Sequence, residues 1–199
     1  MLLAYLLFYL KQYLLFAPLQ MIQYLYVIPI GLMFHASFEF YMSCVGTKFS
    51  FNAFWALAFS FCALLLAPFL QWWLSFPNNR YFSFSSHCFF ISISLFLFNF
   101  SGILKTTLSD FRPESFLIYA KFARLLILFG FFAPISAFFI SSFYGQNPGY
   151  GIYSGVDKLS GLNKALLLLP VFFLCGLTDF VRHFIEREGF EEEKDEEES

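Results

Sequence analysis

Charged residues are scarce in this chain. Asp, Glu, Lys and Arg make up 13% of its 199 residues, whereas 59% are apolar and Phe alone occupies 33 positions. Soluble domains carry about 25% charged residues, because these cover the surface that faces water. The composition therefore excludes a soluble enzyme, and it excludes a disordered chain, which needs low hydrophobicity. We predict an integral membrane protein.

The residues that build metal, redox and nucleic-acid sites are also few or badly spaced. The chain has no CxxC pair, so neither a zinc ribbon nor a thioredoxin-like redox site is expected. Three histidines do not supply a convincing metal or haem site. A basic stripe is missing, which argues against nucleic acid as a partner. We therefore predict no metal, no cofactor and no catalytic residue. The four cysteines are Cys44, Cys62, Cys88 and Cys175.

What the sequence has instead is long apolar runs. A helix needs about 20 apolar residues to cross a hydrocarbon core about 30 Å thick. Because the runs do not alternate apolar and polar residues, they favour helices over the strands of a barrel. We predict an all-α membrane protein, a polytopic bundle of five to six transmembrane helices. Five segments meet the length requirement: residues 19–42, 51–75, 84–104, 116–142 and 163–181.

The apolar run over residues 1–17 is the candidate for a sixth span. It contains Lys11 and is cut off by Pro18. A lysine at this position can extend its ammonium group to the membrane surface, so the run is either a span or a helix lying in the interface. The chain opens Met-Leu-Leu-Ala-Tyr without a basic region, and its apolar sequence continues beyond the usual length of a signal peptide, so we expect this segment to be retained.

The charges divide the chain into a basic body and an acidic tail. Residues 1–185 hold ten bases and five acids, a net charge of +5, whereas residues 186–199 hold nine acids and two bases, a net charge of −7. We interpret the first segment as the transmembrane domain and the second as a disordered cytoplasmic tail. Eight bases fall in connections on the side of the tail and three on the other side. Since cytoplasmic loops are rich in Lys and Arg, the C-terminus is predicted to be cytoplasmic, with a plasma or inner membrane favoured.

Ionisable side chains within the spans are candidate functional groups, because they are costly at membrane depth. His35 and Glu39 are four residues apart and are expected to share one face of a helix. They form a candidate proton relay or ligand-binding pair, with Arg124 of the 116–142 span as the counter-charge. The alternative is that the pair anchors the helix near the cytoplasmic surface.

The connection between residues 104 and 116 contains a Lys followed, after six residues, by Arg-Pro. This spacing resembles the first motif of the membrane lipid-phosphate phosphatases. The resemblance implies that Lys105 and Arg112 contact the oxygens of an anionic phosphate. The histidine motif Pro-Ser-Gly-His that this family carries downstream is absent, and His183 is the only histidine after Pro113.

The expected function is therefore that of a non-enzymatic membrane protein. We predict that it organises the membrane or binds partners, either other membrane proteins or further copies of itself, within the lipid bilayer. The main alternative is a small proton-coupled transporter or channel that uses His35 and Glu39. A lipid-phosphate phosphatase-like enzyme around Lys105 and Arg112 is the third hypothesis.

Overall fold

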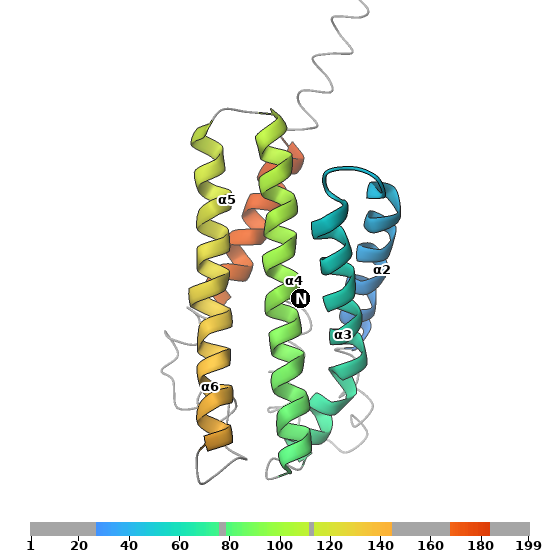
Figure 1. Cartoon of the computed structure of the whole chain (residues 1–199), viewed down its shortest axis with the longest axis vertical. Helices are drawn as coiled ribbons and strands as arrows, with labels where there is room; N and C mark the ends of the chain where they lie inside the picture. Colours follow the sequence, from blue (N-terminus) through green and yellow to red (C-terminus); the bar gives the residue numbers. More distant parts are fainter. Residues whose placement is uncertain (1–26, 76–78, 112–113, 145–167, 184–199) are drawn as a thin grey trace, which may run out of the picture.

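A computed structural model describes residues 27–75, 79–111, 114–144 and 168–183. All regular structure in these ranges is helical, which confirms the prediction of an all-α protein (Figure 1). The last described helix covers residues 168–183. The other helices are α2 (Val27–Cys44), α3 (Ser50–Ser75), α4 (Arg80–Phe111), α5 (Glu114–Ile127), the π-helical turn η2 (Leu128–Phe132) and α6 (Ala133–Tyr144).

These helices match the length and composition of membrane spans. Four segments are long and apolar enough to cross a membrane: Val27–Cys44, Ser50–Leu70, Arg80–Ser109 and Leu117–Ala137. The expected count of five to six spans stays a prediction, because residues 1–17 and 163–167 lie outside the described residues and the predicted span 163–181 is not among these four segments. The acidic tail 186–199 also lies outside the described residues.

The main difference from the expected spans concerns α4. The apolar run predicted a helix over residues 84–104, whereas α4 covers Arg80–Phe111 and has 32 residues. At its start, the Asn79 side chain caps the helix, because Asn79 Oδ1 accepts hydrogen bonds from the backbone N–H of Tyr81 at 2.9 Å and of Phe82 at 3.4 Å. At its end, polar residues continue the helix beyond the apolar run. A helix of this length is about 48 Å long, so its ends extend beyond a hydrocarbon core of about 30 Å.

α4 is the central helix of the bundle, with α3 on one side and α5, η2 and α6 on the other (Figure 1). Its hydroxyl groups are bonded within the helix: the Oγ atoms of Ser86 and Ser94 donate to the carbonyl oxygens of Phe82 and Phe90 at 2.9 and 2.8 Å. Such bonds satisfy polar groups that could not find water inside a membrane. α4 can therefore be rich in serine and still form the interior of an apolar bundle.

Small residues let α3 pack closely against α4. Five buried small residues recur every three or four positions along one face of α3: Ala53, Ala56, Ser60, Ala63 and Ala67. On α4, Gly102 lies against Asn52 of α3, and a Cβ atom at position 102 would be 3.0 Å from Asn52 Nδ2. Since lipid tails are as apolar as leucine side chains, helices in membranes associate through such close packing rather than through the hydrophobic effect.

The helix over residues 114–144 is continuous but contains one wide turn. Pro134 lacks the N–H that would bond to the carbonyl of Gly130, and its ring would clash with that carbonyl in an α-helix. The chain widens to the π-helical turn η2 just before Pro134, where the N–H of Ala133 donates to the carbonyl oxygen of Leu128. Gly130 lies within this turn, and a Cβ atom there would be 3.2 Å from Cγ of Pro170 in helix 168–183. The wide turn is therefore also the place where a second helix packs closely.

Candidate functional site

The His35–Glu39 pair lies in the middle of α2. His35 Nε2 is 3.2 Å from Glu39 Oε1, as the spacing of four residues predicted, and the side chains are 66% and 68% exposed. His35 is the ninth and Glu39 the thirteenth of the 18 residues of α2. The two residues thus contact each other on the outside of the bundle, rather than in its interior.

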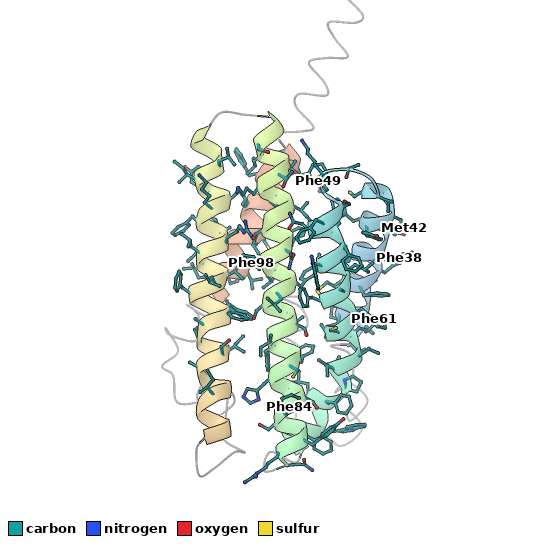
Figure 2. The ribbon with its side chains drawn as sticks, viewed as in Figure 1. Phe38, Met42, Phe49, Phe61, Phe84 and Phe98 are labelled. Carbon is teal, nitrogen blue, oxygen red and sulfur yellow. The ribbon has the colours of Figure 1, made fainter. Side chains whose placement is uncertain are left out.

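The pair belongs to a longer exposed row on α2. Ile28, Leu32 and Met42 are 57%, 62% and 59% exposed, and together with the pair they follow a spacing of four, three, four and three residues. Residues with this spacing form a narrow seam along one side of a helix. We call this row the outer seam of α2: Ile28, Leu32, His35, Glu39 and Met42. Figure 2 shows Met42 on the side of α2 that faces away from the bundle.

The opposite side of α2 packs on α3. The rings of Phe34 and Phe61 have centroids 5.6 Å apart, and those of Tyr41 and Phe54 have centroids 6.0 Å apart. Ile30 and Cys44 are the residues of α2 that are buried. α3 is the main neighbour of α2 among the described helices, so α2 is a peripheral helix with one covered and one uncovered side.

Arg124 lies between α5 and α4. Its Cζ atom is 4.3 Å from the centroid of the Phe98 ring, close enough for a cation–π interaction. Its Nε atom is buried and has no hydrogen-bond partner. Among the described residues, no carboxylate forms an ion pair with it. Arg124 is thus held by a cation–π contact with Phe98. None of the described residues accepts a hydrogen bond from its buried Nε.

The predicted counter-charge relationship does not appear in this arrangement. Arg124 is on α5, whereas His35 and Glu39 are on α2, and both α3 and α4 lie between these helices (Figure 1). Each group therefore has its own surroundings, and we treat them as two separate candidate sites.

Lys105 is part of α4, where the sequence had predicted a loop. Its side chain is partly exposed. The other predicted anion contact, Arg112, lies outside the described residues. The prediction of a loop was wrong because the apolar run ends at residue 104, whereas the backbone stays helical to Phe111. Within this part of the helix, the hydroxyl groups of Thr106 and Thr107 donate to the carbonyl oxygens of Gly102 and Ile103.

Three features were not predicted as parts of a site. Phe98, the ring beneath Arg124, could not be distinguished in sequence from 32 other phenylalanines. The outer seam could have been predicted, because the spacing of three and four residues between its members is visible in the sequence. A second pair with the spacing of His35 and Glu39 closes helix 168–183, where His183 Nε2 is 3.7 Å from Asp179 Oδ1, with side chains 66% and 69% exposed.

Metal-binding geometry is not present in the described part of the chain. No three His, Cys, Asp or Glu side chains there come together in a way that could hold an ion. The four cysteines, all within the described ranges, are free thiols.

Comparisons with known proteins yield no relative. No protein-family model, curated protein or solved structure matches this chain.

Proposed function

We propose that this chain is a multi-pass membrane protein that binds a partner membrane protein through the outer seam of α2. The observation that carries the proposal is the exposed His35–Glu39 pair in the middle of an apolar, peripheral helix. An acidic side chain that faces lipid within a membrane helix is costly, by up to about 3 kcal/mol at the centre of the helix. A partner helix that covers the pair removes this cost.

The seam has the pattern of a helix–helix contact. Apolar residues at both ends, Ile28, Leu32 and Met42, follow the spacing that packs one helix along another. The central polar residues would set register and partner choice, as polar residues at seam positions do in coiled coils. The occupant that we propose is a transmembrane helix of another protein, with a hydrogen-bonding side chain at the depth of Glu39, because the oxygens of a carboxyl group accept hydrogen bonds.

The proposed orientation puts the C-terminus in the cytoplasm. The turn from α2 to α3, the end of α4, the start of α5 and the end of helix 168–183 lie at one end of the bundle (Figure 1). We call this the basic end. Lys48, Lys105, Lys121 and Arg182 lie at or near it in the chain, whereas Arg80 begins α4 at the opposite end. The excess of bases supports the assignment of the basic end to the cytoplasmic side.

Site-specific photo-crosslinking in native membranes tests the proposal. A photoreactive amino acid at position 32 should give one defined adduct, whereas the same group at Ile118 of α5 should not. Ile118 is a matched control, because its 64% exposure is close to the 62% of Leu32. Mass spectrometry then identifies the partner segment, which should be a transmembrane helix with a polar side chain.

A second test asks whether the adduct depends on the His35–Glu39 pair. H35L/E39L should abolish the adduct from position 32, whereas D179L/H183L, which removes the equally exposed pair of helix 168–183, should leave it intact. An adduct that survives H35L/E39L would contradict the proposal. An adduct with twice the mass of the chain would also contradict it, because the partner would then be a second copy.

A further inference from the structure

We propose that Arg124, Lys121 and Lys105 form a binding site for a phosphate monoester on the α4–α5 face at the basic end of the bundle. This site is separate from the outer seam of α2 and does not depend on the function proposed for that seam. It would take the headgroup of an anionic lipid or a free phosphate group, because both present the same charged oxygens.

The position of Arg124 is fixed by Phe98. With Cζ 4.3 Å from the ring centroid, the guanidinium group contacts the π face of the ring. A cation–π contact uses the positive charge of the guanidinium but supplies no oxygen or nitrogen acceptor for its N–H donors. The buried Nε, which has no hydrogen-bond partner, is one such donor. A buried donor without an acceptor is costly, and the terminal N–H groups of the same guanidinium form strong, charge-assisted hydrogen bonds with phosphate oxygens.

The two lysines lie towards the basic end from Arg124. Lys105 is seven residues after Phe98 on α4, so it lies on the same face of that helix, about 10 Å along the axis. Lys121 is one turn before Arg124 on α5, about 4.5 Å along the axis. Because α4 and α5 are antiparallel neighbours, both steps lead towards the same end of the bundle.

The side-chain directions also favour a common site. Side chains on a helix tilt towards its N-terminus. Those of α5 therefore tilt towards the basic end and those of α4 tilt away from it, so Lys121 and Arg124 approach Lys105 from the opposite helix. Lys121 is exposed and Lys105 partly exposed, which leaves the two ammonium groups accessible. Neither forms an ion pair with a carboxylate of the described residues.

The depth of the three cations suits a lipid headgroup. Arg124 is seven residues from the start of the Leu117–Ala137 span and Lys105 is four residues from the end of the Arg80–Ser109 span. These separations correspond to about 10 Å and about 6 Å. A lysine side chain bridges the shorter of these distances to the membrane surface, whereas the guanidinium of Arg124 stays deeper, over Phe98. Basic pockets between helices at the cytoplasmic surface are a recurrent way of binding anionic lipid headgroups.

Binding of a fluorescent phosphatidic acid to the full chain in detergent micelles tests the site. Saturable binding is expected, whereas fluorescent phosphatidylcholine, whose phosphate is capped by choline, should not bind saturably. R124Q should weaken phosphatidic acid binding by about tenfold, and K105Q and K121Q by roughly three- to tenfold each. K48Q is the matched control, since it removes a cation at the same end of the bundle but in the turn between α2 and α3.

Competition by inorganic phosphate distinguishes the two sources of the anion. If inorganic phosphate displaces the lipid at its own dissociation constant, the site recognises phosphate as such. If inorganic phosphate does not displace the lipid, the site requires the lipid. Either result supports the proposal. Equal binding by the wild type, R124Q and K105Q would overturn it. K105Q keeps the test decisive should R124Q unfold, because Lys105 takes no part in the Arg124–Phe98 contact.

Discussion

The guanidinium of Arg124 lies over the ring of Phe98, with Cζ 4.3 Å from the ring centroid, and so joins α5 to α4 by a contact between a cation and an aromatic face. Figure 2 shows Phe98 in the space between these two helices. The contact holds a charge inside a bundle in which no carboxylate of the described residues pairs with it. It therefore explains how an arginine is accommodated at this depth.

Replacing Phe98 with leucine should destabilise the bundle and weaken the hold on Arg124. We expect the F98L and R124Q changes to be coupled by about 0.5–2 kcal/mol, the range of cation–π interactions from exposed to desolvated sites. A double-mutant cycle from unfolding in mixed detergent measures this coupling. F129L is the control for loss of a ring, because Phe129 is 68% exposed. A coupling near zero between positions 98 and 124 would show that the ring does not stabilise the cation.

Gly130 should not tolerate a side chain. A Cβ atom at this position would be 3.2 Å from Cγ of Pro170, and a proline ring has little freedom to move away. We expect G130A to lower the free energy of unfolding by about 1–3 kcal/mol, the usual effect of overpacking.

Gly176 provides the comparison within helix 168–183, because a Cβ atom there would meet nothing within 4 Å. G176A should be neutral or stabilising by up to about 1 kcal/mol, since alanine favours helix more than glycine does. Thermal unfolding of both variants in one detergent checks the contrast. Equal effects of the two substitutions would mean that helix 168–183 does not approach η2 as closely as described.

The buried face of α3 should reject a large residue. Ala63 is fully buried in the row of small residues, and leucine at this position would push α3 away from its neighbours. We expect A63L to cost about 1–3 kcal/mol or to prevent folding. A36L, on the exposed side of α2, adds the same atoms where they face outwards and should leave stability nearly unchanged. Fluorescence-detected size-exclusion chromatography after heating compares the two; similar losses would argue against close packing along this face.

The sequence predicted the helices better than their ends. Apolar length was enough to find α3 at Ser50–Ser75, within one residue of the predicted segment 51–75. It failed for α4, because a helix ends where its hydrogen bonds end rather than where its apolar residues do. The cap at Asn79 begins this helix before its apolar run, and the backbone stays helical through the polar residues up to Phe111.

The sequence also identified the polar groups of both candidate sites but not their surroundings. The spacing of His35 and Glu39 was sufficient to predict that the two contact each other. Their exposure was not predictable, because it depends on where α3 packs. Arg124 was recognised as a charge within a span, whereas its contact with Phe98 required the alignment of α5 against α4.

The scarcity of charge by itself determined the expected class of this protein: 13% charged residues are few for a surface that faces water, and long apolar runs favour helices, which satisfy the backbone internally. Only the tertiary structure decided which side of each helix faces inwards. In a soluble protein hydrophobic periodicity gives that answer, because one side meets water. In lipid both sides of a helix meet apolar surroundings, so the inward side is set by close packing of small residues. That packing makes α4 the centre of the bundle, leaves His35 and Glu39 on its outside, and brings Arg124 against Phe98.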